Sequence, residues 1–407
     1  MKLLIISETF PFPPIAGHKM ALYNYLRLLS ENNCITFAGF HEHGEVIMPD
    51  QINMVKKYCR VGQVHSMVDM NNKNILCHIM AADPLSLKRY HNQSFINNLK
   101  TLLKKEHYDL VHCFGFNVGQ FGKYAIGLPK VFTPVDCTTL FYRRMTHQRE
   151  VSILRRMYYA VQAKKIEKYE NRMCMLFDAC YVFSEEDRLA LIKICPESNV
   201  FAVPFGVDVA KQTDEAPLKL DGPTLVFSGN MSTKVNINSA LYFYKRIFPL
   251  IRQELPSVYL IIAGSGPDKR IKELGKEDDK VIITGYVENL IPYIMMADVY
   301  VAPILSATGI QTRVLEAMAL GKAIVSTSQP MKIFHALSGV HAFITDDPAE
   351  FAQNTIRLLK DVRLKERMGI AARSLVCEKY SWRAAIKMIE QIHQDALNTW
   401  KIKNEIN

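Results

Sequence analysis

Short apolar runs alternate with longer amphipathic stretches along most of this 407-residue chain. The runs are apolar throughout and rich in β-branched residues, which is typical of strands buried on both faces of a parallel sheet. A first series comprises residues 3–7, 35–40, 110–115, 130–135, 179–184 and 200–205. A second series comprises residues 224–228, 258–264, 281–285, 299–304 and 323–327. The alternation predicts right-handed βαβ units, and therefore two doubly wound, Rossmann-like α/β domains.

The polar stretch between the two series marks the predicted domain boundary. Residues 206–223 contain two prolines and show no apolar period, so we interpret them as a linker. We expect an N-terminal domain over residues 1–205 and a C-terminal domain over residues 224–380. Residues 381–407 have helical spacing and could pack back on the N-terminal domain. Ligands of open parallel sheets bind beyond the carboxyl ends of the strands, so we expect the two domains to face each other across a cleft.

Composition is consistent with two buried cores. Hydrophobic residues make up 49% of the chain and charged residues 22%, and the length suits two domains of roughly 150 to 200 residues. No apolar run reaches the ~18 residues of a spanning helix, and Glu8 with a proline cluster interrupts the first run before it could be a signal peptide. We therefore expect a cytoplasmic protein. The nine cysteines lack metal or disulfide spacing and are interpreted as core residues.

The formal net charge of +10 is concentrated in one segment. Residues 141–173 hold nine basic and three acidic residues, mixed with aromatic and aliphatic ones. An interfacial helix places such residues against anionic lipid headgroups, which would make the protein peripheral at the inner face of the membrane. A solvated helix face whose apolar side packs on the sheet explains the pattern equally well. No nucleic-acid-binding motif accompanies the charge, so we expect no nucleic acid partner.

The most informative stretch reads SATGIQTRVLEAMALGKAIVST, residues 306–327. A loop after a strand leads into a helix that begins near Gln311 or Thr312, and the N–H groups at that helix end suit a diphosphate. Arg313 could add a full positive charge there. Glu316 lies one turn further on, where a carboxylate can accept hydrogen bonds from the vicinal hydroxyls of a ribose. The alternative for Glu316 is a solvated helix position, although its neighbours are apolar.

Several stretches together resemble the retaining nucleotide-sugar glycosyltransferases of family 4, which have the GT-B fold. They are LEAMALGKAIVST, VPFGVD, LVFSGNMSTKVNINSALYF, LIIAGSGP and VIITGYVENLIPYIMMADVYVAP, with ETFPFPPIAGHKM near the start. The resemblance implies transfer of a sugar from a nucleoside diphosphate sugar to a glycan or lipid-linked acceptor, with retention, in cell-surface polysaccharide or glycolipid synthesis. It also implies that the C-terminal domain holds the donor and the N-terminal domain the acceptor.

The resemblance makes Glu316 the second acid of the family's paired-glutamate motif, which binds the ribose. The first acid would lie eight residues earlier, where this chain has Thr308. A threonine can hydrogen-bond a sugar hydroxyl but offers no full charge. The residues Gly309, Ile310, Gln311, Thr312 and Arg313 look like a subset of the family with a Gly-Ile-x-x-Lys/Arg run at this point.

The resemblance places the donor phosphates near a second strand end. Gly229 turns the chain there, Asn230 stands where the family has an arginine, and Lys234 remains to neutralise charge. Gly264 and Gly266 form a turn after the following strand and could abut the nucleotide. A plain surface lysine and an ordinary structural turn are the alternatives for Lys234 and for this glycine pair.

Two further groups complete the predicted donor site. Tyr286, Val287 and Leu290 follow the strand VIITG, where the resemblance implies recognition of the base. Gly17 and His18 follow the first strand, where the resemblance places a glycine-rich loop that approaches the phosphates from the N-terminal domain. An ordinary loop is the alternative for the second group.

Catalytic candidates in the N-terminal half are His112 and Asp136, which we place at two strand ends pointing into one cleft. Each could orient an acceptor hydroxyl or accept its proton, with Glu316 acting from the other domain. A buried structural histidine and an aspartate that caps the next helix are the alternatives.

The sequence has no Asp-x-Asp pair at a strand end that could hold a divalent metal. We therefore expect no metal and no cofactor, with helix N-termini and Lys or Arg side chains balancing the phosphate charge. Two other functions remain open. One is another GT-B enzyme, such as a nucleotide-sugar epimerase. The other is a noncatalytic nucleotide-sugar binder, which the residues Thr308 and Asn230 make plausible.

Overall fold

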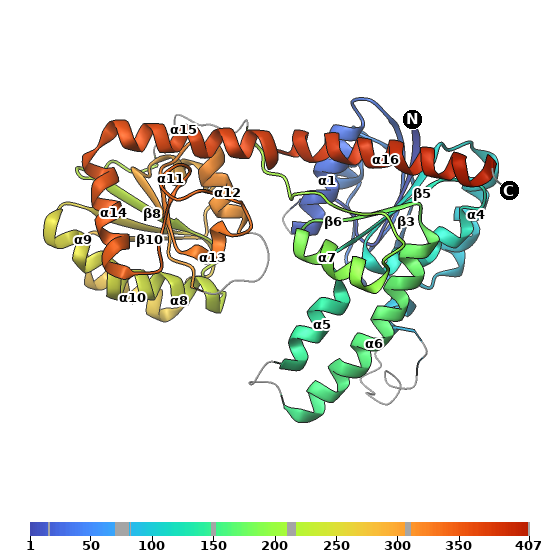
Figure 1. Ribbon diagram of the computed structural model, residues 1–407, viewed down its shortest axis with the longest axis horizontal. Coiled ribbons are helices and arrows are strands. Elements are labelled where there is room, and N and C mark those ends of the chain that lie inside the picture. Colours follow the sequence, from blue (N-terminus) through green and yellow to red (C-terminus); the bar gives the residue numbers. More distant parts are fainter. Residues whose placement is uncertain are drawn as a thin grey trace. The chain divides into compact units, whose positions relative to one another are not determined.

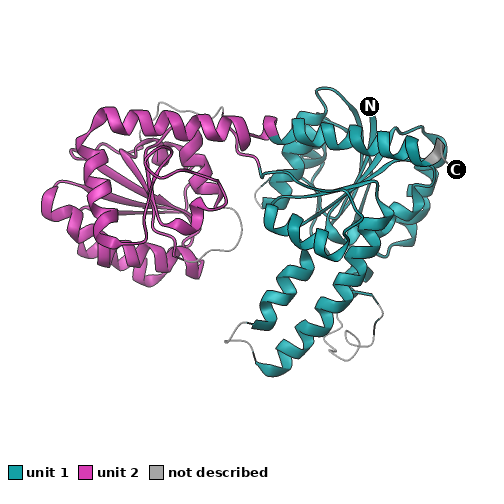
Figure 2. Cartoon of the chain, in the orientation of Figure 1, with its two compact units in different colours: residues 1–205, 385–407 teal, residues 206–384 magenta. Residues whose placement is uncertain are grey.

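The computed structural model describes residues 1–14, 17–69, 81, 83–147, 152–209, 217–305 and 311–405. These residues form two compact units (Figure 2). Unit 1 consists of Met1–Phe205 together with Ala385–Asn407, and unit 2 of Gly206–Ala384. Of the predicted linker, residues 210–216 lie outside the described residues. Val207 forms a bridge with Ser381, so this part of the predicted linker is built into unit 2.

Unit 1 contains a seven-stranded parallel sheet with the order β3-β2-β1-β4-β5-β6-β7. Its strands are β1 (Lys2–Ser7), β2 (Cys34–His41), β3 (Arg60–Ser66), β4 (Leu110–Phe114), β5 (Lys130–Val135), β6 (Ala179–Val182) and β7 (Val200–Ala202). Every predicted strand of the first series is present, and β3 is an additional edge strand. The winding direction reverses between β1 and β4, which is the position where ligands bind in doubly wound folds.

The helices of unit 1 cover both faces of this sheet, except for one pair that extends away from it (Figure 1). They are α1 (Gly17–Leu29), α2 (Pro49–Lys56), α4 (Gln93–Lys105), α5 (Thr138–His147), α6 (Ile153–Leu176), α7 (Glu185–Ile194) and most of α16 (Trp382–Glu405), with 3₁₀ helices η1 (Leu85–Tyr90) and η2 (Phe116–Tyr124). The extending pair is α5 and α6, which pack side by side. We call this pair the hairpin. It carries most of the basic segment recognised in the sequence.

Unit 2 contains a six-stranded parallel sheet with the order β10-β9-β8-β11-β12-β13. Its strands are β8 (Thr224–Ser228), β9 (Tyr259–Ala263), β10 (Val281–Gly285), β11 (Val299–Ala302), β12 (Ile324–Ser326) and β13 (Phe343–Ile344). Here the winding direction reverses between β8 and β11. The prediction of two doubly wound α/β domains is therefore confirmed.

The helices of unit 2 differ in how their first turns are capped. They are α8 (Lys234–Tyr242), the π-helical turn η3 (Phe243–Ile247), α9 (Phe248–Glu254), α10 (Lys269–Glu277), α11 (Ile291–Met295), α12 (Thr312–Ala319), α13 (Ser328–Met331), α14 (Pro348–Lys360) and α15 (Val362–Lys379). The side chains of Thr233, Asp268, Asp347 and Asp361 accept hydrogen bonds from the first turns of α8, α10, α14 and α15. Such caps satisfy N–H groups that the helix itself leaves unpaired.

The sequence LEAMALGKAIVST has a structural explanation in how α12 ends. The backbone N–H of Lys322 donates to Ala317 O at 3.0 Å and that of Gly321 to Met318 O at 2.9 Å, with Gly321 at φ 71°. This is the Schellman arrangement, which favours glycine at that position. A Cβ on Gly369 of α15 would overlap the carbonyl oxygen of Gly321, so two glycines let α12 and α15 approach closely.

Candidate active site

The loops after β8 and β9 in unit 2 pack so closely that only glycine fits. A Cβ on Gly264, whose φ is 139°, would overlap the carbonyl oxygen of Gly229. A Cβ on Gly229 would lie 2.6 Å from Asn236 Nδ2. The N–H of Met231 donates to Ser265 O at 2.7 Å and joins the two loops. The sequence-predicted glycines at these two strand ends are therefore brought together, and they leave backbone atoms accessible where side chains would otherwise stand.

The amino end of α8 lies directly behind these loops. Lys234 is the first residue of the helix, and Thr233 caps it by accepting from Asn236 N. The Oδ1 of Asn230 accepts from Ser232 N at 3.0 Å and from Ser232 Oγ at 2.7 Å. The structure thus explains Asn230 as the residue that orders the turn into α8. Lys234 is the residue whose positive charge is predicted to neutralise the donor phosphates at this strand end.

At the amino end of α12, Glu316 and Arg313 form an ion pair with 2.6 Å between Arg313 Nη1 and Glu316 Oε2. Both side chains are partly exposed. Burial raises the pKa of Tyr300 to about 12, hydrogen bonds from Ser228 oppose this shift, and the charge of Glu316 adds to it. The Tyr300 hydroxyl lies 3.0 Å from Ser228 Oγ. Glu316 lies in α12, which follows β11, and β11 is the neighbour of β8 at the reversal point of this sheet.

Other predicted donor residues lie around the same sheet edge or outside the description. Thr308, Gly309 and Ile310 lie outside the described residues, whereas Gln311 is the N-cap of α12 and Thr312 its first residue. Tyr286 and Val287 directly follow β10, and the Tyr286 side chain is 77% exposed. Leu290 is the N-cap residue of α11.

In unit 1, Gly17 and His18 begin α1. A Cβ on Gly17 would meet no atom within 4 Å, so packing alone does not demand glycine there. The pKa of His18 is lowered, chiefly by burial and then by the charge of Lys19. Lys19 itself pairs with Glu45 at 3.0 Å.

His112 does not stand at a strand end, which corrects the sequence-based expectation. It lies in the middle of β4, and its side chain is fully buried. It is hydrogen-bonded through Nδ1 to the Tyr25 hydroxyl and through Nε2 to Thr133 Oγ1 at 2.9 Å, with His393 Nε2 of α16 3.2 Å from Nδ1. Burial holds the pKa of His112 well below its usual value. The ring is a structural group between sheet and helices, so it does not reach an acceptor.

Asp136 directly follows β5 and is exposed, so it is not brought together with the buried His112. It does not cap α5 either. The N–H groups of Thr138 and Thr139 donate to Glu170 at 2.7 and 3.3 Å, and that of Cys137 to Asp187 at 3.0 Å. Although Asp136 is accessible at its surface, partial desolvation by the surrounding protein raises the pKa of its carboxyl group, and the charge of Asp187 adds to this. The carboxylate that serves the amino end of α5 is Glu170 of α6.

A second polar cluster, which sequence reasoning missed, lies at the reversal point of the sheet in unit 1. Glu8 follows β1, and its Oε2 accepts from the backbone N and the Nδ2 of Asn117, at 3.0 and 2.9 Å. Burial raises the pKa of Glu8, and these two hydrogen bonds oppose the shift. Gly115 has φ 118°, and a Cβ there would overlap the Glu8 side chain. An acid directly after the first strand, with a glycine after β4, is the signal that could have revealed it.

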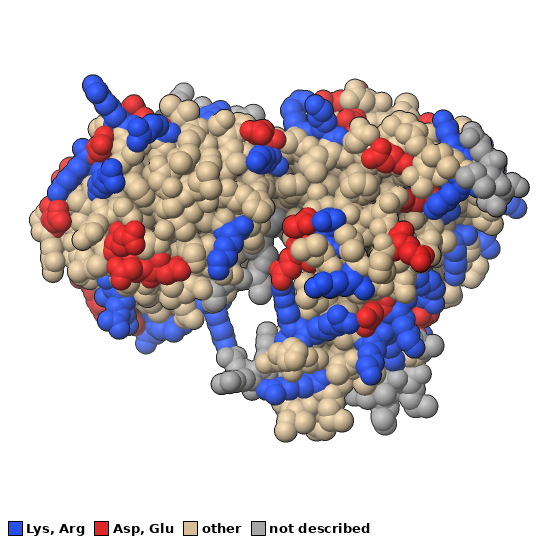
Figure 3. All heavy atoms as spheres, viewed as in Figure 1, with Lys and Arg blue, Asp and Glu red and all other residues tan. Residues whose placement is uncertain are grey.

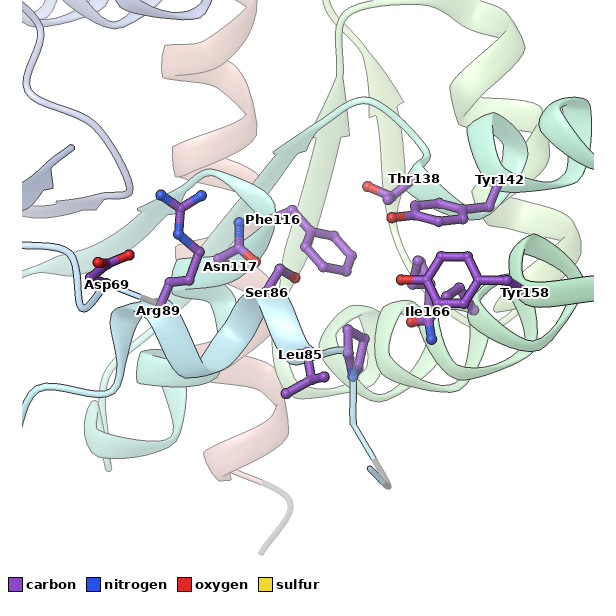
Figure 4. Close-up of a pocket in the computed structure, with 12 residues that line it drawn as sticks. Asp69, Leu85, Ser86, Arg89, Phe116, Asn117, Thr138, Tyr142, Tyr158 and Ile166 are labelled. Atoms are coloured by element: carbon purple, nitrogen blue, oxygen red, sulfur yellow. The ribbon is translucent and has the colours of Figure 1, made fainter. Parts of the chain in front are cut away.

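Asn117 lines a pocket of about 510 Å³ within unit 1 (Figure 4). The residues lining one end of it include Asp69, Ser86, Arg89 and Asn117, and those lining the other include Thr138, Tyr142, Tyr158 and Ile166. The pocket opens where the chain leaves β3, β4 and β5, at the carboxyl edge of the sheet. Tyr142 and Tyr158 come from the two helices of the hairpin. Within the described part of the chain, His, Cys, Asp and Glu side chains form no group that could hold a metal ion.

Comparison with known proteins gives these two units a context. Residues 222–361 match the family described as Glycosyl transferases group 1. An uncharacterized 44.6 kDa protein in the cps region of Klebsiella pneumoniae is 22% identical over 390 residues, 93% of this chain and 96% of that protein. Phosphatidyl-myo-inositol mannosyltransferase of Mycolicibacterium smegmatis is 27% identical over 207 residues, 48% of this chain and 52% of that protein. The chain thus matches about half the length of this mannosyltransferase.

Solved structures resemble the whole chain. HepE of Anabaena, solved in complex with UDP, aligns with a TM-score of 0.62 at 13% identity, over 96% of this chain and 99% of that one. At this level of identity the likeness speaks for the fold. No helix in the described ranges is both long and apolar enough to cross a membrane.

Proposed function

We propose that this chain, a glycosyltransferase with the GT-B fold, transfers a sugar from a nucleoside diphosphate sugar to a glycan or lipid-linked acceptor. The donor is assigned to unit 2 and the acceptor to unit 1. Retention of configuration, membership of family 4 and a role in cell-surface polysaccharide or glycolipid synthesis are parts of the proposal. The UDP bound to HepE and the mannosyltransferase relative support a nucleotide-sugar donor.

The observation that carries the donor assignment is the edge of the sheet in unit 2. The glycine-only approach of Gly229 and Gly264 and the amino end of α8 offer backbone N–H groups to phosphate oxygens. Glu316 stands near the adjacent strand end, where its carboxylate can accept hydrogen bonds from ribose hydroxyls. Arg313, at 2.6 Å from Glu316, holds that carboxylate in place and adds positive charge beside the phosphates.

Chemistry in this site requires charge stabilisation more than a strong base. The leaving diphosphate can take the acceptor proton itself, so the burial of His112 does not prevent transfer. Lys234, Arg313 and helix N-termini supply the positive potential that lowers the barrier to leaving-group departure. On this proposal no metal takes part.

The hairpin supports peripheral contact with an anionic membrane. It exposes Phe141 in the first turn of α5 and Ile153, Leu154 and Met157 in the first turns of α6, with side chains from 56% to 79% exposed. Lys and Arg side chains gather over the same helices (Figure 3). Some are paired, such as Arg143 with Glu167, whereas Arg155, Lys164 and Lys168 have no acidic partner among the described residues. Each basic residue near an anionic surface contributes about 1 kcal/mol.

The donor proposal is tested by thermal shift and turnover with a panel of UDP-, GDP- and other sugar nucleotides. Nucleotide release that depends on an added membrane lipid extract supports transfer. An altered sugar that stays on its nucleotide indicates an epimerase, and binding without turnover indicates a noncatalytic binder. Both outcomes would refute the transfer reaction.

The site assignment is tested with Glu316→Ala. Loss of the ribose hydrogen bonds should weaken donor binding by roughly 1.5–3 kcal/mol, or about tenfold to a hundredfold. The matched control is Glu366→Ala on the exposed face of α15, which should bind donor like the parent. Donor affinity that survives Glu316→Ala would show that the ribose lies elsewhere.

Membrane contact is tested by flotation with phosphatidylcholine vesicles that contain or lack phosphatidylglycerol. We expect binding to the anionic vesicles alone, reduced by salt. Replacing Ile153, Leu154 and Met157 by serine should abolish it. Ile126→Ser is the control, because Ile126 is 88% exposed in unit 1 but lies outside the hairpin. Equal loss in both variants would contradict a role for the hairpin.

A further inference from the structure

We propose that the pocket of unit 1 binds the terminal sugar of an amphiphilic glycoside, with Asn117 Oδ1 accepting a hydrogen bond from one of its hydroxyls. This inference rests on the proposed function, since it names the acceptor class of the same enzyme. The pocket, the orientation of Asn117 and the continuity of the pocket with the hairpin carry it independently of any motif.

Asn117 presents an acceptor atom that the protein leaves without a donor. Its Oδ1 is buried and has no hydrogen-bond partner among the described residues. Its Nδ2 donates to Glu8 Oε2 at 2.9 Å. Because the amide nitrogen is held by Glu8, the oxygen has to face the other way. Buried carbonyl oxygens are normally paired, so an unpaired one that lines a pocket indicates a missing hydrogen-bond donor, such as a sugar hydroxyl.

Glu8 acts on this site as a positioning residue. It holds both the side chain and the backbone N–H of Asn117 through one oxygen. Gly115 makes room for it, since any Cβ at that position would overlap the Glu8 side chain. Glu8 after β1, and Gly115 and Asn117 after β4, thus fix the orientation of one side-chain amide group.

One end of the pocket is polar and the other is aromatic, which suits the hydroxyl groups and the apolar C–H face of a sugar ring. At one end, Arg89 and Asn117 offer a donor and an acceptor for hydroxyl groups, and Asp69 adds a carboxylate (Figure 4). At the other end, Tyr142 and Tyr158 present aromatic rings, on which the apolar C–H face of a pyranose can pack. A volume of about 510 Å³ lies within the range of small-ligand sites.

Continuity with the hairpin selects an amphiphile over a free sugar. Tyr142 is preceded by Phe141 in α5 and Tyr158 by Met157 in α6, and the side chains of Phe141 and Met157 are 56% and 63% exposed. On this proposal, an aglycone that leaves the aromatic end of the pocket packs on these exposed side chains of the hairpin. The sugar would be held in the protein while its lipid remains in the membrane that the hairpin contacts.

Calorimetric titration of the full chain, below micelle formation, tests this with octyl glucoside, octyl galactoside and octyl mannoside against the corresponding methyl glycosides. At least one octyl glycoside should bind roughly tenfold tighter than its methyl counterpart. Asn117→Ala should weaken that binding about tenfold, whereas Asn97→Ala, on the exposed face of α4, should not. Met157→Ser should remove the advantage of the octyl chain and leave methyl glycoside binding unchanged.

The positioning role of Glu8 is tested by rescue. Glu8→Gln keeps an oxygen that can accept from Asn117 and should bind within about threefold of the parent, whereas Glu8→Ala should match Asn117→Ala. Asn117→Ala that unfolds like the parent yet binds octyl glycosides equally well would overturn the inference, as would absence of binding. UDP-induced thermal shifts measured on the same samples separate the two proposals, because an intact donor site with an empty pocket refutes only this one.

Discussion

The carboxyl edges of the two sheets are built in opposite ways. In unit 2 the edge consists of glycines whose backbones touch, as between Gly229 and Gly264, and short polar side chains order the turns. In unit 1 the edge consists of buried carboxylates and large side chains, as at Glu8 and Glu170, around a pocket. A ligand in unit 2 would meet mainly backbone, and one in unit 1 mainly side chains. The site in unit 2 should lose ligand binding when a Cβ is added to a glycine. The site in unit 1 should lose it when a side chain is shortened.

The largest effect is expected from adding one methyl group in unit 2. In Gly264→Ala the new Cβ would overlap the carbonyl of Gly229 at a φ that L residues rarely adopt. Strain and displacement of the loop should destabilise the protein by roughly 3 kcal/mol or more and abolish donor binding. Thermal unfolding checks the stability. Gly17→Ala is the control in unit 1, since nothing within 4 Å would meet its Cβ. Similar destabilisation by both changes would remove the contrast between the two edges.

A smaller effect, on the pH dependence of folding stability, is expected from the ionisation of Glu170 in unit 1. Burial raises the pKa of Glu170 to about 7 from an ordinary 4.5, while hydrogen bonds from Thr139 and Thr138 oppose the shift. The folded state therefore binds the proton more tightly than the unfolded state, so this group loses stability as pH rises from 4.5 through 7. The parent's stability relative to Glu170→Gln should fall by up to ~1.4 kcal/mol per pH unit in this window. Chemical denaturation at pH 5 and pH 8 measures it, and a difference independent of pH would contradict the assignment.

The histidine cluster of unit 1 should respond in the opposite sense. Burial lowers the pKa of His393 to about 3 from 6.5, so the folded state excludes a proton that the unfolded state binds. Stability from the neutral ring is complete above pH 6.5 and is lost as pH falls toward 3. His393→Gln should cost about 1–3 kcal/mol at pH 7, because the Tyr25 hydroxyl loses one of its two histidine partners, the one at 3.1 Å, and keeps His112. That cost should shrink on acidification, and the same denaturation series reveals it. A constant cost would show that the ring is charged in the folded protein.

The smallest effect is expected from chelation. Helix N-termini and the side chains of Lys234 and Arg313 are proposed to balance the phosphate charge in unit 2, so EDTA should leave the nucleotide-induced thermal shift unchanged. Lys234→Ala, in contrast, should weaken nucleotide binding and its dependence on salt. A shift that disappears with EDTA and returns with Mg²⁺ would show that a metal ion does the work assigned to these side chains.

In each sheet the sequence predicted every strand except one edge strand. Strands buried on both faces and glycines at strand ends are local properties, which appear in consecutive residues such as TLVFSGN. Strand β3, with residues RVGQVHS, was missed because an edge strand is partly exposed and carries polar residues. Strand β13 has only two residues and left no pattern.

The pocket of unit 1 could not be predicted in the same way. Its walls come from η1, η2, α5 and α6, which lie far apart in the chain. His112 was placed at the end of a strand predicted over residues 110–115, but it lies in the middle of β4, where two more buried residues follow it. Asn117 is held by Glu8, which lies 109 positions earlier in the chain. Residues that come together only through the topology of the fold leave no periodic pattern in the sequence.

Helix α16 begins in unit 2 and ends in unit 1, where His393 completes the cluster around Tyr25 and His112. During synthesis on a ribosome, residues 206–384 emerge as an uninterrupted block, whereas unit 1 lacks helix α16 until that block has emerged. The later half of the polypeptide can therefore fold first, while the earlier half waits with part of its interior uncovered. Chaperones that recognise exposed apolar surface would meet the amino-terminal half for longest.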